Sequence, residues 1–577
     1  MAIIQNEFEE FVSQMAIENA ISFNGTSNPK ALIGKCIQKF PEMKQEMGTY
    51  SKIINEIVEK INKLGLEKQK EELMKFNPDF FEKKKEKKEP NKTDGLPNLE
   101  GCENGVVVRF PPAPSGHLHL GHLFGIVANY EFKIKYGGKF ILRLEDTNPE
   151  NIDLSNYEKV IEDTNWITDN GVDEIFYQSD RLSIYYKYLR QYFGLGECYY
   201  CNCDSETFKA YTDNKEICPH RKFDQNKKEE LFEKFMSGEI EGVIRANADI
   251  ENKNPALRSF PLARINRSSH PRTKDKYFVW PNYNFAAAID DSLMGITHVI
   301  RGKDLEIGEE RQKMILKSLN LRIPIYFHYG RLKFEDIDLS KTKISQLIKE
   351  GKYSSWEDPR VPSILAYKKR GYKAQAFREY ILSLGISKRD SKITSEEYHK
   401  GLDFLNKQIL EKTANRTFFV HNPKKVHITN ISDFPDKEIK IQKHPDDKSR
   451  GNRIIKITSN WYIDSIDFDN LNVNDKLRLM HFANFEITNK NKDELELKFI
   501  SKEYDKEFKF KRNIHFVSEN ENENCEVILS DNSHLKGICE KIDNIKEDEP
   551  IQFERFGFVK FDHIDKNKNR VFYFTHR

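Results

Sequence analysis

The chain has 577 residues, of which 93 are basic and 91 are acidic, so its formal net charge at pH 7 is only +2. A chain of this length is expected to fold into several domains with separate cores. The charge balance excludes a uniformly positive surface, so binding to a polyanion would depend on local basic patches. No run of about 18 apolar residues occurs, and the first residues carry acids where a targeting peptide would carry bases. We therefore expect a cytoplasmic protein without membrane contact.

Residues 1–95 are predicted to form a helical domain followed by a charged linker. Ile54, Ile57, Val58, Ile61 and Leu64 follow the three-four spacing of one helix face. The run EKKKEKKEPNKTDG at 82–95 cannot support a core, and we interpret its lysines as a solvated tether rather than an RNA-binding tail. The helical segment is a candidate surface for protein partners.

Residues 96–190 are predicted to form the first half of a Rossmann-like α/β domain. A strand over 105–110 leads through a proline-rich turn into a helix that opens at HLHLGH, and a second strand follows at 139–144. Strand, helix and strand in this order predict a parallel sheet. His119 and His122 are predicted to share a helix face near the positive end of the helix dipole, where a phosphate would bind.

An insertion is expected over residues 191–255, and it holds four of the eight cysteines. One C-x-C pair and one C-x-H pair supply the number of ligands that a closed tetrahedral zinc site needs: Cys201, Cys203, Cys218 and His220. Cys198 could replace one of them. The alternative is a loop of reduced cysteines without metal, and if zinc binds, its role is expected to be structural.

The second half of the α/β domain is expected over 256–330, and a helical region over 331–425. From about Val426 to residue 577, apolar and polar residues alternate in short segments. This pattern predicts an all-β region of antiparallel sandwiches or barrels.

The segment RFPPAPSGHLHLGH (109–122) resembles the HIGH signature of class I aminoacyl-tRNA synthetases as it stands in the glutamyl and glutaminyl group. DLSKT (338–342) resembles the second signature, KMSKS, with Asp338 replacing the first lysine and Lys341 matching the second. WEDPRVPS (356–363) resembles the acceptor-stem segment of the same group. With ALIGKCIQKFP near the start and the β-rich end, the resemblance covers nearly the whole chain and points to the archaeal and eukaryotic type of glutamyl-tRNA synthetase.

This resemblance implies ATP-dependent activation of L-glutamate to glutamyl-adenylate and its transfer to the 3' end of tRNA(Glu). His119, His122 and Lys341 would be catalytic and would bind ATP together with Gly121 and Ser340. Mg²⁺ would accompany the nucleotide. The β-rich end would form paired barrels that hold the anticodon.

The segments PNYNFAAAIDD (281–291) and GITHVIRG (295–302) resemble those that close the amino-acid pocket of glutamyl enzymes. Arg301 would pair with the substrate's side-chain carboxylate, whereas a neutral amide would leave its charge uncompensated. Arg109 and Tyr283 would be further contacts, and Glu145 would accept from the substrate ammonium. Two alternatives remain: a glutaminyl enzyme, which Arg301 disfavours, and a catalytically silent tRNA-binding relative, which the retained signatures disfavour.

Overall fold

The computed structural model describes residues 2–22, 25–40, 43, 46–76, 95–504 and 511–577. Contacts divide the chain into two compact units, residues 1–91 and 92–577. Apart from Gly95, the linker predicted at 82–95 lies outside the described residues. No helix in the described ranges is long and apolar enough to cross a membrane.

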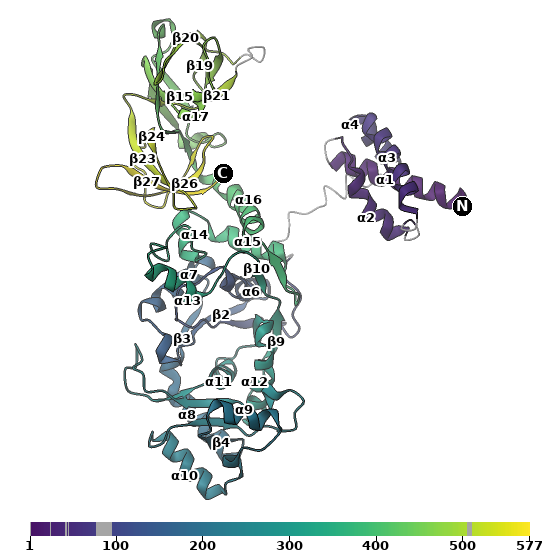
Figure 1. The fold of residues 1–577 in the computed structure, drawn as a ribbon, viewed down its shortest axis with the longest axis vertical. Coiled ribbons are helices and arrows are strands. Elements are labelled where there is room, and N and C mark those ends of the chain that lie inside the picture. Colours follow the sequence, from purple (N-terminus) through teal and green to yellow (C-terminus); the bar gives the residue numbers. More distant parts are fainter. Residues whose placement is uncertain (1, 23–24, 41–42, 44–45, 77–94, 505–510) are drawn as a thin grey trace. The chain divides into compact units, whose positions relative to one another are not determined.

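The first unit is helical, as predicted. Its main helices are α1 (Ala2–Ser22), α2 (Pro29–Lys39), α3 (Met47–Lys63) and α4 (Leu66–Phe76), drawn in purple in Figure 1. Ile54, Val58 and Ile61 are buried on one face of α3, as their spacing predicts. Leu64 is exposed, because α3 has already ended and Leu64 is its C-cap residue.

The second unit contains the predicted parallel sheet. Two parallel groups form it: β1 (Val106–Phe110), β2 (Gly138–Leu144) and β3 (Glu174–Tyr177), and then β8 (His298–Gly302) and β9 (Ile325–Tyr329). Thr297, just before β8, donates its backbone N–H to the carbonyl of Val107 at 2.9 Å. This bond places β8 next to β1, so the strand order reverses between them.

Strand β1 pairs closely with β2 because Gly138 stands at the start of β2. A Cβ atom at this position would lie 1.9 Å from the carbonyl oxygen of Val106, and Gly138 has a φ of +119°. Only glycine fits such an approach. Helix α6 (Leu120–Tyr136) connects the two strands and is buried along most of its length.

An antiparallel sheet lies between β3 and α11 (Tyr283–Leu293) in the chain. Its strands are β4 (Cys198–Cys201), β5 (Val243–Ala246), β6 (Pro261–Ile265) and β7 (Val279–Pro281), and the helices around it are α8 (Leu182–Gly194), α9 (Ser205–Asp213) and α10 (Gln225–Met236). Helix α7 (Ser155–Ile167) instead lies between β2 and β3 in the chain and packs against α6. The sheet continues to Pro281, beyond the 191–255 range of the expected insertion. It ends directly before α11, which carries Tyr283.

A mainly helical region follows, as Figure 1 shows in green. Helix α12 (Glu306–Ser318) lies between β8 and β9 in the chain and packs against α11. The region after β9 contains α13 (Lys341–Lys349), α14 (Ile364–Arg370), α15 (Ala374–Leu384) and α16 (Ser395–Thr413), together with the short pair β10 (Leu332–Phe334) and β11 (Ser391–Ile393). In this region, α13 begins inside the predicted lysine signature.

The C-terminal region is β-rich, and its described residues form two seven-stranded barrel-like sheets. The first has the order β12-β25-β26-β27-β23-β24-β13. It comprises β12 (Asn415–Thr417), β13 (Phe419–His421), β23 (Asn522–Ile528), β24 (His534–Glu540), β25 (Pro550–Phe553), β26 (Gly557–Ile564) and β27 (Arg570–His576).

The second sheet has the order β21-β18-β19-β20-β14-β17-β22. It comprises β14 (Lys424–Ile428), β17 (Asn460–Ile463), β18 (Lys476–Leu479), β19 (Ala483–Lys490), β20 (Glu494–Ser501), β21 (Arg512–Ile514) and β22 (Val517–Ser518), beside the hairpin β15 (Glu438–Gln442) and β16 (Asn452–Lys456) and the short helix α17 (Ser465–Asp469). Both sheets include parallel pairs, such as β23 with β27 and β14 with β20, and are therefore mixed rather than purely antiparallel as expected.

Candidate active site

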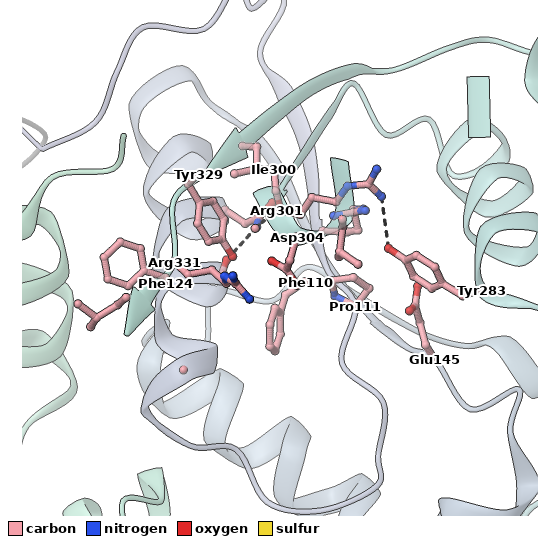
Figure 2. Close-up of a pocket in the computed structure, with 17 residues that line it drawn as sticks. Phe110, Pro111, Phe124, Glu145, Tyr283, Ile300, Arg301, Asp304, Tyr329 and Arg331 are labelled. Carbon is pink, nitrogen blue, oxygen red and sulfur yellow. Dashed lines mark hydrogen bonds between the residues drawn. The ribbon is translucent and has the colours of Figure 1, made fainter. Parts of the chain in front are cut away.

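A pocket of about 450 Å³ opens at the carboxyl ends of β1, β2 and β8, where the strand order of the sheet reverses (Figure 2). Ligands of open α/β sheets bind at this kind of position. Arg109 comes from β1, Glu145 follows β2 and Arg301 comes from β8, while Tyr283 begins α11. All four line the pocket, so the structure brings together the residues predicted to contact the amino acid.

A chain of buried ion pairs links two of these residues. The guanidinium of Arg109 donates to Asp291 through Nε at 3.1 Å and Nη2 at 3.4 Å. Asp291 also accepts from Arg143 at 2.7 Å, and Arg143 donates to Glu145 at 3.0 Å. Both arginines and Asp291 are fully buried, so each of these charges needs an oppositely charged partner to offset the cost of its burial. Arg109 still has one donor, Nη1, without a hydrogen-bond partner among the described residues.

Burial and the neighbouring arginines determine the protonation of Glu145 and Asp291 in this series of ion pairs. Burial raises the pKa of Glu145 to about 7, and Arg143 and Arg109 oppose that rise. For Asp291, burial acts in the same direction, but Arg109 and Arg143 outweigh it and lower the pKa. Asp291 is therefore ionised at neutral pH, whereas Glu145 is an acceptor close to its titration point.

Arg301 is bound by neutral groups. Its Nη1 donates to the side-chain amide oxygen Oε1 of Gln312 at 3.0 Å and to the hydroxyl of Tyr283 at 3.3 Å, and its Nε donates to Nε2 of His328 at 3.3 Å. The side chain is 4% exposed, and no carboxylate of the described residues lies within 4.0 Å of its nitrogens. Its Nη2 has no partner in the described part of the chain. A buried, unpaired guanidinium of this kind needs an anion to offset its charge.

The two signature histidines begin helix α6. His119 is the N-cap residue rather than part of the helix, and its Nδ1 accepts from the backbone N–H of Gly121 at 3.1 Å. The Nδ1 of His122 accepts from the backbone N–H of His119 at 3.1 Å, and the ring centroids lie 3.9 Å apart. Burial and Lys341 lower the pKa of His119 to about 4, and burial also lowers the pKa of His122. Both imidazoles are therefore neutral at pH 7 and can donate hydrogen bonds.

The lysine signature lies against the histidine signature. Ser340 is the N-cap of α13, its hydroxyl accepting from the N–H of Lys343 at 3.4 Å, and Lys341 is the first helical residue. A Cβ atom at Gly116 would lie 3.3 Å from Cδ of Lys341, so the lysine stem packs on that glycine. Burial lowers the pKa of Lys341. The structure thus places the five residues predicted to bind ATP around the start of α6, beside the pocket.

Comparison with known proteins agrees with this geometry. Residues 105–412 match the family described as tRNA synthetases class I (E and Q), catalytic domain, and residues 414–505 match the anti-codon binding domain of the same class. The glutamate–tRNA ligase of Pyrococcus furiosus is 39% identical over 97% of this chain and 98% of its own length. The chain belongs to the glutamate–tRNA ligase family. Relatives from Pyrococcus abyssi (40% identical, 97% of this chain and 98% of that protein) and Methanobrevibacter smithii (38%, 99% and 100%) carry the same name.

A cluster of cysteine and histidine side chains, separate from the pocket, lies at strand β4. The ligand atoms of Cys201, Cys203, Cys218 and His220 all lie within 4.8 Å of one another. The Sγ atoms of Cys201 and Cys203 lie 3.8 Å and 3.7 Å from that of Cys218, and Nδ1 of His220 lies 3.3 Å from the latter. A tetrahedron with metal–sulfur bonds of about 2.3 Å has edges of about 3.8 Å, so the four residues can hold a metal ion.

Cys198 does not belong to this cluster. Successive side chains of a strand alternate between its faces. Cys198 packs in the core with Tyr200, whereas Cys201 packs with Tyr199 on the other face of β4. The alternative ligand considered from the sequence is therefore placed away from the four grouped residues.

Arg143 and Asp291 were not identified as site residues from the sequence, although a feature of the sequence marks each of them. Arg143 interrupts the otherwise apolar run FIL-L of β2, and Asp291 ends a buried segment of α11 rich in alanine. A charged residue inside a buried element needs a partner, so the two could have been paired with each other.

Proposed function

We propose that this chain activates L-glutamate with ATP to form glutamyl-adenylate and transfers the glutamyl group to the 3' end of tRNA(Glu). The observation that carries the choice of amino acid is Arg301, a buried guanidinium whose described partners are all neutral. A side-chain carboxylate would offset its charge, and a carboxamide would not.

The charge of the whole pocket supports glutamate as well. The buried or largely buried charged groups that face it or support it are Arg109, Arg143 and Arg301 with Glu145 and Asp291, whereas Arg331 and Asp304 at its edge are exposed. With Glu145 ionised, the arginines exceed the acids by one. Glutamate carries one net negative charge at neutral pH and glutamine carries none. Glutamate therefore neutralises the site, whereas glutamine would leave one buried positive charge.

The first step would be attack of the substrate α-carboxylate on the α-phosphorus of ATP, with pyrophosphate leaving. The chain would supply position and charge rather than a covalent nucleophile. We assign the substrate ammonium to Glu145 and the side-chain carboxylate to Arg301, with Arg109 and Tyr283 as further contacts. His119, His122 and Lys341 would hold the phosphates, with Gly121 and Ser340 shaping their surroundings.

Two metal ions and one nucleic-acid surface complete the proposal. Mg²⁺ would be held mainly by the phosphate oxygens of ATP and would neutralise their charge. Zn²⁺ would be held by the Cys/His cluster, where it would fix the loops around β4. The C-terminal barrels would bind the anticodon of tRNA, and a cytoplasmic location remains a prediction.

Aminoacylation assays test this function directly. The purified chain, with ATP, Mg²⁺ and a tRNA(Glu) transcript, should charge labelled glutamate with a kcat/KM at least roughly a hundredfold above that for glutamine. The same assay with tRNA(Gln) shows whether the second tRNA is also charged with glutamate. Preferential charging of glutamine would contradict the proposal, and no charging of either amino acid would favour a silent tRNA-binding relative.

The metal site gives a separate prediction. Protein purified without chelators should contain about one zinc per chain, and Cys203→Ser should lose it, because a lost thiolate opens the tetrahedron. Elemental analysis measures the metal content. Cys198→Ala is the matched control and should keep the zinc, since Cys198 packs on the other face of β4. Zinc-free wild-type protein, or equal loss in both variants, would contradict the assignment.

A further inference from the structure

The side chain of His328 in β9 lies behind Arg301. It is buried, and its ring stacks against Tyr326 with centroids 6.3 Å apart. Its Nε2 lies 3.3 Å from Nε of Arg301, and its Nδ1 lies 3.3 Å from a carboxylate oxygen of Glu309 in α12. His328 therefore stands between the pocket arginine and an acid outside the pocket.

The hydrogen-bond chemistry of Arg301 fixes the tautomer of His328. The Nε–H of arginine is always a donor, so Nε2 of His328 must be an unprotonated acceptor. The ring proton is then on Nδ1, which points at Glu309, and the carboxylate favours that tautomer. Glu309 itself is paired with Lys313. The result is a chain in which an acid orients an imidazole, and the neutral imidazole orients the guanidinium.

We propose that His328 and Glu309 are positioning residues for substrate selection: they hold Arg301 with a neutral acceptor, so that its charge remains available for the side-chain carboxylate of the substrate. This inference rests on the proposed use of glutamate and on Arg301 as its reader. A carboxylate in direct contact with Arg301 would hold it equally well, but it would also neutralise the charge that separates glutamate from glutamine.

The surroundings of His328 keep it neutral at pH 7. The charged groups that face it are Arg301 from β8, Glu306 and Glu309 from α12, and Lys388. Burial and Arg301 lower its pKa below the ordinary 6.5, while Glu309 opposes the shift. Protonation in acid would place an N–H on Nε2 against the N–H of Arg301, so the two groups would repel and Arg301 would move.

Two substitutions test whether the acceptor atom of His328, rather than the imidazole ring itself, positions Arg301. His328→Met removes the acceptor and keeps the bulk, and the ratio of kcat/KM for glutamate to that for glutamine should fall roughly three- to tenfold, the value of one hydrogen bond. His328→Gln keeps an acceptor oxygen at similar reach and should hold the ratio within about threefold of wild type. The KM for ATP should be unchanged in both variants. A changed KM for ATP would indicate that His328 acts in ATP binding instead.

The pH dependence of the same ratio is a second, independent test. Glu145 also titrates near pH 7, but wild type and His328→Gln both contain it, so its effect on the ratio is common to the two proteins and the comparison is made between them. In wild type the ratio should fall at acidic pH, once His328 becomes protonated below the ordinary histidine pKa of 6.5, and it should fall further than in His328→Gln. In His328→Gln this additional fall should be absent, because the amide does not titrate.

The outcomes distinguish this inference from the function on which it rests. If wild-type protein fails to charge glutamate, the proposed function is wrong. If wild type charges glutamate but His328→Met keeps the wild-type ratio, or His328→Gln keeps the wild-type pH dependence, then His328 does not position Arg301 and the inference is overturned. Should His328→Met fail to fold in thermal denaturation, the pH comparison with His328→Gln decides alone.

Discussion

Lys341→Ala should slow formation of glutamyl-adenylate by roughly 10²- to 10³-fold, the usual loss when one group that stabilises transition-state charge is removed. The neighbouring histidines cannot replace it, because burial is the main cause of the lowered pKa of His119 and remains in the variant. The affinity for tRNA should barely change, since this charge is needed mainly as the phosphates rearrange.

Single-turnover kinetics and filter binding separate these two effects. Lys343→Ala is the matched control: it removes a lysine from the same helical turn, but that lysine is exposed and pairs with Asp338 at 3.0 Å. It should leave adenylate formation within about twofold, as exposed pairs contribute little. Equal losses of rate and tRNA affinity in Lys341→Ala would reassign Lys341 to RNA binding.

The sequence predicted the location of this site well, because its determinants are local. Three prolines and a glycine end β1 and force a turn before α6, so the histidine signature had to lie at the carboxyl edge of the sheet. The start of α13 inside the lysine signature follows from Ser340, a strong N-cap residue. Helix α6 was predicted to open at His117 but begins at Leu120, so His119 is its N-cap residue; sequence patterns do not fix helix ends to this precision.

The partners of the pocket residues could not be predicted, because they come from distant parts of the chain. Arg143 and Asp291 are 148 residues apart, and they meet because α11 packs beside β2 in the folded chain. The contact of His328 with Arg301 depends in the same way on the parallel register of β8 and β9. Sequence alternation likewise predicted β-strands at the C-terminal end but not the parallel pairs that make its sheets mixed.

Arg301→Ala should weaken the use of glutamate far more than the binding of ATP. Each charge-assisted hydrogen bond to the side-chain carboxylate contributes roughly 1.5–3 kcal/mol, so the kcat/KM for glutamate should fall about ten- to a hundredfold. The use of glutamine should fall less, because the variant no longer buries an unpaired guanidinium against a neutral amide.

Arg331→Ala is the control for a loss of charge alone. Arg331 lines the same pocket, but it lies away from the contact between Arg301 and Tyr283, toward the left of the view in Figure 2. Its removal should leave the preference between the two amino acids unchanged, whatever it does to the overall rate.

The ratio of kcat/KM for glutamate to that for glutamine, measured with saturating tRNA(Glu) in wild type, Arg301→Ala and Arg331→Ala, tests most directly whether this pocket reads a carboxylate. We predict a high ratio in wild type and Arg331→Ala and a ratio at least roughly tenfold lower in Arg301→Ala. An unchanged ratio in Arg301→Ala would show that Arg301 does not read the side chain, and the choice of glutamate would then have to come from Arg109 and Tyr283.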